Sequence, residues 1–113
     1  MQHSLTAMLE MNRVGILSVE KIVEKMCHAP ANLFRIDRRG YIREGYFADL
    51  VLVDPEQKWT VSAENILYKC GWSPFEGMKF SNKVTHTFVN GNLVYNDGAI
   101  VSEKPGRRLM FNR

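Results

Sequence analysis

Three histidines and two cysteines are the residues of this sequence best suited to hold a metal ion. His3, His28 and His86 lie far apart, and no His-x-His pair, HExxH motif or Cys–His cluster occurs. Cys27 and Cys70 lie outside any CxxC motif, so we expect reduced, partly buried thiols. Each histidine is therefore expected to have a structural role, and the residues predict no metal ligand.

Two aspartates and a serine are the other candidates for hydrolytic chemistry. Asp49 and Asp54 flank an apolar run, where a carboxylate pair could act as general acid and base. Turn-forming aspartates that accept hydrogen bonds from backbone N–H groups are the commoner use of this arrangement. Ser73 lacks the GxSxG context of an activated serine, and no glycine-rich phosphate loop occurs. The residues alone predict no catalytic group.

Helical spacing of apolar residues occupies the first third of the chain. A first helix is expected to begin with Ser4 as its N-cap and to end at Gly15. A second is expected to begin at Ser18 and to stop ahead of Pro30, which lacks the needed N–H and starts a short third turn over 30–34. The apolar faces consist of Leu5, Met8, Leu9, Ile22, Val23 and Met26.

Strand patterns follow residue 37. The continuous apolar run 50–53 predicts a strand buried on both faces, and 59–62 alternates like a half-buried strand. Asn90-Gly91 predicts a type I′ hairpin, with 99–101 as a further strand. The fold class is therefore α+β, with short helices followed by an antiparallel sheet. The expected core residues are Leu50, Val51, Leu52, Val53, Trp59, Val84, Phe88, Val89 and Val94.

Length and composition indicate one small globular domain. The 113 residues are 45% hydrophobic and 24% charged, with a net charge of +3. No window approaches a membrane span and no signal peptide is recognisable, so we expect a cytoplasmic protein with no membrane partner. The basic run 104–108 is read as a solvated tail, and no nucleic-acid partner is predicted.

A series of short motifs extends along nearly the whole chain. They are Ala29-Pro-Ala-Asn-Leu-Phe34, Gly45-Tyr-Phe-Ala-Asp-Leu-Val-Leu-Val-Asp54, Lys69-Cys-Gly-Trp-Ser-Pro-Phe-Glu-Gly77, Val84, Thr87, Val89-Asn-Gly91, Val94-Tyr95 and Gly98. Their order resembles the C-terminal end of the cyclic amidases of the amidohydrolase superfamily, which are dihydroorotase, allantoinase and dihydropyrimidinase. The Cys-Gly-Trp-Ser-Pro form and the Gly-Arg-Arg-Leu-Met-Phe ending resemble bacterial class I dihydroorotases most.

This resemblance implies a fold and a function for a longer parent protein. Residues 1–36 would be the last helices of a TIM barrel, and 37–113 the C-terminal share of a small β-sandwich. The parent would use zinc to interconvert N-carbamoyl-L-aspartate and dihydroorotate, a small-molecule reaction of pyrimidine biosynthesis. The family's zinc ligands match no position here, so we expect a fragment that is inactive alone and binds no zinc. Another cyclic amidase, or a stand-alone scaffold module, remains an alternative.

Two positions, one loop and one property complete the expectations from the resemblance. Gln2 and His3 match the loop that leaves the last barrel strand, so they are predicted to lie near the substrate, unless they only start the helix. Cys70–Gly77 is predicted to be a constrained seam between barrel and sandwich, anchored by Trp72 and Phe75. Open strand edges and the apolar helix face predict self-association of the chain.

Overall fold

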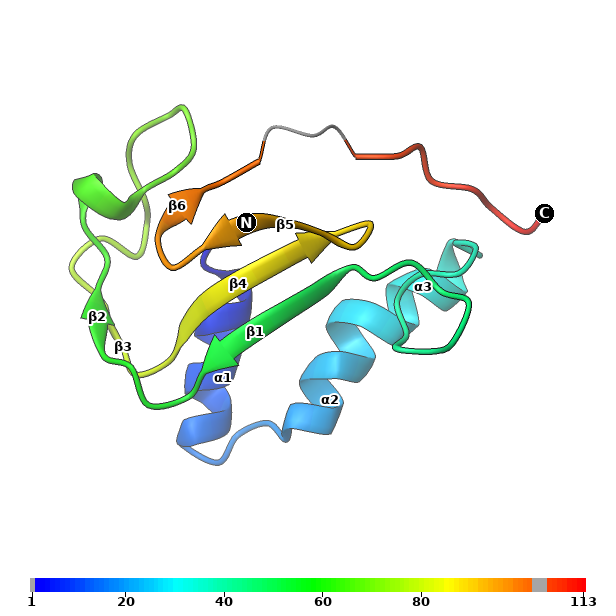
Figure 1. Ribbon diagram of the computed structural model, residues 1–113. Coiled ribbons are helices and arrows are strands. Elements are labelled where there is room, and N and C mark those ends of the chain that lie inside the picture. The colour runs from blue at the N-terminus through cyan, green and yellow to red at the C-terminus, as the bar shows by residue number, and fades with distance from the viewer. Residues whose placement is uncertain (1, 103–105) are drawn as a thin grey trace.

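A computed structural model describes residues 2–102 and 106–113, and it shows the expected order of helices followed by an antiparallel sheet (Figure 1). The helical part comprises α1 (Ser4–Arg13), α2 (Val19–Val23), the π-helical turn η1 (Glu24–His28) and α3 (Ala29–Leu33). The strands are β1 (Leu50–Asp54), β2 (Trp59–Thr60), β3 (Lys79–Phe80), β4 (Lys83–Val89), β5 (Asn92–Asn96) and β6 (Ala99–Ile100), with a 3₁₀ turn η2 (Ala63–Asn65) after β2.

The helix boundaries confirm one predicted cap, and they correct another cap and one predicted helix end. Ser18 caps α2 by accepting a hydrogen bond from Lys21 N at 3.1 Å, as expected. Ser4 is not a cap, because His3 occupies the N-cap position of α1. No side chain there accepts a capping hydrogen bond from the backbone of the first turn. The chain also stays helical through Pro30 instead of stopping before it. A proline ring crowds the carbonyl four residues earlier, and the wide turn η1 just before Pro30 accommodates this interruption.

The main sheet has the strand order β1-β4-β5-β6, and β2 pairs with β3 in a separate two-stranded sheet. The hairpin between β4 and β5 is confirmed, since Asn90 and Gly91 both have the positive φ that a type I′ turn requires. The segment 41–44 is irregular and ends in a turn. Pairing of Leu50 with Phe88 and of Leu52 with His86 places these four side chains on one face of the sheet.

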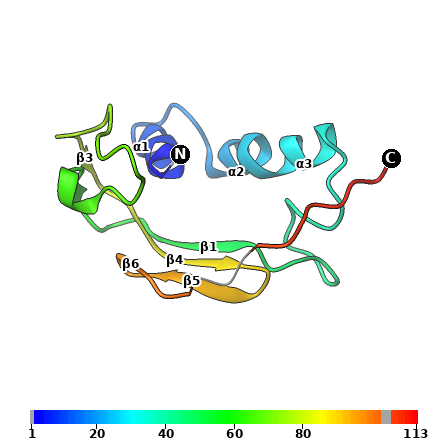
Figure 2. The same cartoon turned by 90° about the horizontal axis from the view of Figure 1, so that it is seen from above.

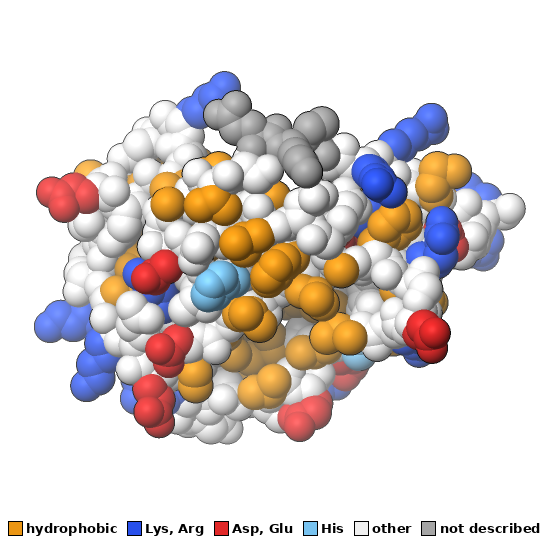
Figure 3. All heavy atoms as spheres, in the orientation of Figure 1, with side chains coloured by type: hydrophobic (Ala, Val, Ile, Leu, Met, Phe, Trp, Pro, Cys, Tyr) orange, Lys and Arg blue, Asp and Glu red, His pale blue; other side chains and the backbone are white. Residues whose placement is uncertain are grey.

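The helices cover only one face of this sheet (Figure 2). Val51 and Val53 point to the helices and share a groove with Leu5, Leu9 and Ile22. The opposite face is open, and hydrophobic side chains gather across its middle (Figure 3). Leu52 on that face is 52% exposed and Val51 is 43% exposed, so the prediction that β1 is buried on both faces is wrong. Within the described residues β1 is an edge strand, and one of its faces is uncovered.

The buried core lies away from the predicted residues. The expected core positions other than Val51 and Leu52 are only half-buried. The fully buried apolar residues are Ile22, Ala31, Val61 and Phe80, and the buried polar ones are His3, Thr6, Arg39, Ser73 and Asn82. The buried residues therefore gather mainly at the junction between α1 and the small sheet β2–β3. Ile22 and Ala31 are the buried apolar residues of the helical arm, which runs from α2 to α3.

The C-terminal residues return to the end of the helical arm. Asp37 N donates to Met110 O at 2.8 Å and Asn112 N donates to Arg35 O at 2.8 Å. Arg107 and Arg108 are exposed, as a solvated tail requires, but the described end of the tail is docked rather than free. Lys104 of the same basic run lies outside the described residues. Within the described ranges, no helix has the length and apolarity needed to cross a membrane.

Candidate functional site

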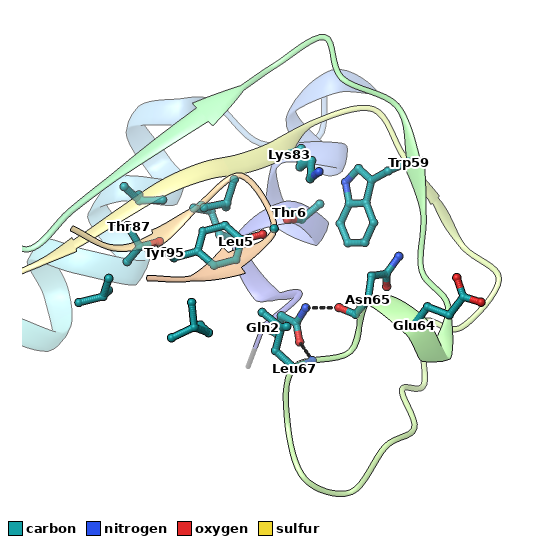
Figure 4. A pocket seen from close by; sticks show the side chains of 15 residues that line it. Gln2, Leu5, Thr6, Trp59, Glu64, Asn65, Leu67, Lys83, Thr87 and Tyr95 are labelled. Atoms are coloured by element: carbon teal, nitrogen blue, oxygen red, sulfur yellow. Dashed lines mark hydrogen bonds between the residues drawn. The ribbon is translucent and has the colours of Figure 1, made fainter. Parts of the chain in front are cut away.

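Gln2 joins the start of α1 to the loop that follows β2 (Figure 4). Its Nε2 donates to Asn65 O at 2.8 Å, and its Oε1 accepts from Leu67 N at 2.9 Å. The nitrogen and the oxygen of the side-chain amide thus both form hydrogen bonds with backbone groups more than sixty residues away in sequence. The amide acts as a clamp on this loop.

His3 lies in an aromatic cage beside this clamp. Its ring is 3% exposed and lies 5.9 Å from the rings of Trp59 and Phe75, 6.2 Å from Tyr68 and 6.5 Å from Phe80. Nδ1 is 3.3 Å from Ser73 Oγ, and Nε2 is buried without a hydrogen-bond partner. A charged imidazole is poorly solvated there, so burial lowers the pKa of His3.

The short connection from β3 to β4 is also held to α1. Glu10 Oε1 accepts from Ser81 N at 2.5 Å and from Asn82 Nδ2 at 3.3 Å, and Asn82 Nδ2 also donates to Thr6 O at 3.2 Å. Burial raises the pKa of Glu10, but the donors at Ser81, Arg13 and Asn82 outweigh this effect and hold the pKa below its usual value. These contacts were missed from the sequence, because Glu10 resembles any exposed helix residue.

A groove of about 550 Å³ opens next to the Gln2 clamp, between α1 and the sheet (Figure 4). Its lining is mainly apolar, and the charged residues in it are Glu64 and Lys83. The other lining residues are Gln2, Leu5, Thr6, Val51, Trp59, Asn65, Leu67, Val84, Thr87, Val94, Tyr95, Gly98 and Ile100. Among the described residues, neither a nucleophile–base pair nor a metal-ligand set lines this groove.

Asp49 organises the other end of the sheet. It pairs with the buried guanidinium of Arg39, and its Oδ1 accepts from Asn90 N at 2.9 Å. Arg39 also donates to Asn90 Oδ1 at 2.8 Å and stacks 4.2 Å from the ring centroid of Phe47. Asp49 thus accepts from a backbone N–H, as expected, but the partner is in the distant hairpin turn. Asp54 is a turn-forming aspartate of the expected local kind, because its Oδ1 accepts a hydrogen bond from Glu56 N at 3.0 Å.

The remaining sequence candidates are dispersed. His28 stacks on Tyr41 with ring centroids 4.1 Å apart, and His86 bonds Thr85 Oγ1 at 2.9 Å. Cys27 and Cys70 are free and both exposed, so the expected partial burial of the thiols is wrong. Trp72 is 62% exposed and does not anchor its loop, whereas Phe75 does so through His3. Across the described residues, no group of three or more His, Cys, Asp or Glu side chains is placed to hold a metal ion.

The buried histidine predicts a pH-dependent stability. The folded-state pKa of His3 is below the unfolded value of about 6.5, so its contribution is complete above that pH and is lost as the pH falls through the folded-state pKa. Each pKa unit by which the folded state lowers this value corresponds to about 1.4 kcal/mol in the free energy of unfolding. Urea denaturation between pH 7.5 and 5 should therefore show that the free energy of unfolding falls more steeply with pH for the wild type than for His3→Gln. Equal slopes for the two proteins would contradict this assignment.

Comparison with known proteins places this arrangement among hydrolases. The family model described as "Amidohydrolase family" matches residues 1–94. The dihydroorotase of Pyrococcus horikoshii is 34% identical over 110 residues, which are 97% of this chain and 26% of that protein. An allantoinase of Desulfitobacterium hafniense is 37% identical over 89 residues, covering 79% of this chain and 20% of that protein.

The solved structures agree with this relationship. An L-hydantoinase (dihydropyrimidinase) from Arthrobacter aurescens superposes with a TM-score of 0.80 at 35% identity, covering 88% of this chain and 23% of that one. The chain spans about a quarter of the length of these curated relatives and of this solved structure. The resemblance carried by the motifs is confirmed, and the chain belongs to the amidohydrolase family.

Proposed function

We propose that this chain forms the C-terminal portion of a dihydroorotase, an enzyme that reversibly cyclises N-carbamoyl-L-aspartate to dihydroorotate. The observation that carries the proposal is the match to the Pyrococcus horikoshii dihydroorotase over 97% of this chain. Two further dihydroorotases support the same substrate class. That of Pyrococcus abyssi is 38% identical over 96 residues, and that of Clostridium acetobutylicum is 38% identical over 91 residues.

In this proposal the two parts of the chain belong to two parts of the enzyme. Residues 1–36 supply the last helices of a TIM barrel, and residues 37–113 supply the C-terminal share of a β-sandwich. The clamp of Gln2 on 65–67 and the contact of His3 with Ser73 then join barrel to sandwich, with the loop Cys70–Gly77 as the seam. The supporting geometry is that Gln2, just before α1, bonds the loop after β2, and that Glu10 of α1 bonds Ser81, just after β3.

Zinc chemistry belongs to the remainder of such an enzyme. A bound zinc ion supplies an activated hydroxide for attack on the ring amide, and the described residues of this chain do not form a site for it. The contribution of Gln2 and His3 is to hold the segment at the N-terminal end of α1 near the substrate-binding face of the barrel. Their polar atoms are directed at the loop, so we assign them positioning rather than catalytic roles.

Two other functions have specific support. The allantoinase and hydantoinase relatives favour a different cyclic amide as the substrate of the same kind of enzyme. A stand-alone scaffold module is favoured because the helices pack on the chain's own sheet. This packing leaves Ile22 of α2 only 3% exposed.

The coding sequence upstream of the Met1 codon distinguishes these functions. We expect the open frame to continue upstream into a His-x-His motif, and the protein made from it to open dihydroorotate faster than allantoin or hydantoin. Faster opening of allantoin or hydantoin would replace dihydroorotase by that cyclic amidase. An in-frame stop codon and a ribosome-binding site directly before Met1 would instead support the scaffold module and overturn the proposal.

A further inference from the structure

The turn between β4 and β5 contains a dipeptide that can react with itself. Asn90 is the one asparagine of the chain that a glycine follows. Because Gly91 has no side chain, its backbone nitrogen can approach the side-chain amide of Asn90 closely. Attack of this nitrogen on Cγ of Asn90 forms a five-membered succinimide, and the side-chain nitrogen leaves as ammonia with the proton that Gly91 N loses. Water then opens the ring at either carbonyl, which leaves aspartate or isoaspartate at position 90.

Hydrogen bonds to the segment that leads into β1 hold both reacting groups in the folded chain (Figure 1). Gly91 N donates to Ala48 O at 3.0 Å, so the attacking nitrogen is occupied. Arg39 Nη2 donates to Asn90 Oδ1 at 2.8 Å, which fixes the side-chain amide. Asp49 Oδ1 accepts from Asn90 N at 2.9 Å, and Asp49 also pairs with the buried guanidinium of Arg39. The reaction therefore requires the turn to detach from this network.

The other two-residue turn of the sheet lacks this protection. Asp97 and Gly98 join β5 to β6, and their φ values of 43° and 95° match the positive φ of the first turn. Gly98 N donates to no group of the described residues, and the side chain of Asp97 is 67% exposed. Aspartate forms the same succinimide by losing water instead of ammonia. The two turns therefore share a backbone conformation and differ in the hydrogen bond to the glycine nitrogen.

We propose that Asn90 is a site of spontaneous deamidation and that the pair of Arg39 and Asp49 controls its reaction. While the pair holds the turn, Asn90 is stable, and when the turn opens, Gly91 N is free to attack. Isoaspartate at position 90 adds one carbon atom to the backbone of the turn, which a two-residue hairpin contains only with a change of register. Deamidation therefore makes the release of the hairpin permanent. This inference goes beyond the proposed function and does not depend on it.

Mass spectrometry of the purified chain, incubated at mildly alkaline pH with and without urea, tests the proposal. The rate is followed by the gain in mass of the peptide that contains Asn90, and isoaspartate is measured there and at Asp97. We expect Asn90 to react at least about tenfold more slowly in the folded chain than in urea, because the local opening of the turn costs free energy. Formation of isoaspartate at Asp97 should be slowed less by folding.

Two aspartate variants identify the cause of the protection. Asp49→Ala removes the carboxylate that holds Asn90 N and should speed deamidation of the folded chain about tenfold. Asp54→Ala is the matched control, because Asp54 also accepts from a backbone N–H but lies at the other end of β1, and its rate should equal that of the wild type. Circular dichroism shows whether each variant is folded. If Asp49→Ala does not fold, Arg39→Lys repeats the test, since lysine keeps the charge but loses the fork that reaches both partners.

Three outcomes would overturn the proposal. The first is an equal rate at Asn90 with and without urea. The second is equal slowing of the two turns by folding, which would assign the protection to the turn conformation alone. The third is a folded Asp49→Ala or Arg39→Lys protein that deamidates as slowly as the wild type.

Discussion

Replacement of Phe80 by alanine should destabilise the chain by about 3–5 kcal/mol, which is the usual cost of deleting a buried aromatic ring. Phe80 is 1% exposed, and its ring centroid lies 5.5 Å from that of Trp59 and 6.1 Å from that of Phe75. It closes the cage around His3, so its loss would also leave a cavity beside an unpartnered ring nitrogen. The free energy of unfolding is measured by urea denaturation monitored by circular dichroism.

Phe34→Ala provides the matched control for this experiment. Phe34 is 60% exposed at the end of α3, so removing its ring should cost less than about 1 kcal/mol. Similar losses at Phe80 and Phe34 would show that the packing centre does not lie at the β2–β3 sheet.

The second large effect is expected at Gly40, where the chain leaves the helical arm. Gly40 has a φ of +82°, and a Cβ there would lie 2.4 Å from Ala31 Cβ and 2.8 Å from Cys27 O. Gly40→Ala therefore combines the cost of a left-handed backbone, about 1–2 kcal/mol, with an overlap worth about 1–3 kcal/mol. Because one of the clashing atoms is a backbone carbonyl, the overlap is relieved only by moving the α3 arm away from the loop.

Gly45→Ala separates these two contributions. Gly45 has a φ of +80°, but no atom lies within 4 Å of its hypothetical Cβ. This variant should lose only the conformational part, about 1–2 kcal/mol. The difference in melting midpoint between the two variants measures the contact with Ala31. Identical midpoints would contradict the close approach of the loop to the arm.

Local sequence signals predicted the local parts of the fold. Asn90-Gly91 specified its turn because the positive φ values needed at both positions are a property of two residues. Ser18 specified the start of α2 because its hydroxyl reaches an N–H three residues away. These features depend on neighbours in sequence, so no tertiary information was needed to find them.

Burial and site geometry depended on partners that are distant in sequence. The apolar run of β1 looks the same in a central strand and in an edge strand, and only the strand order distinguishes the two. His3 is buried by Ser73 and the aromatic rings around it, about seventy residues along the chain. A lone histidine before a helix carries no signal of such a cage, whereas the family motif from Ser73 to Gly77 marked the loop that provides it.

The motifs shared with the amidohydrolases have a physical explanation in this structure. The aspartate of the Ala48-Asp49-Leu50 motif ties the hairpin turn at Asn90 to the buried Arg39. The Ser73-Pro-Phe-Glu-Gly77 motif supplies Ser73 and Phe75 to the His3 cage. Both motifs therefore hold segments together that are distant in the sequence.

We propose that this segment supports the catalytic centre of an amidohydrolase without containing one. Its most direct test is the rate of dihydroorotate ring opening by the purified 113-residue chain with added zinc, with metal content measured on the same sample. We expect a rate equal to that of buffer with zinc, and less than one tightly held zinc ion per chain. Turnover accompanied by one or two zinc ions per chain would contradict it.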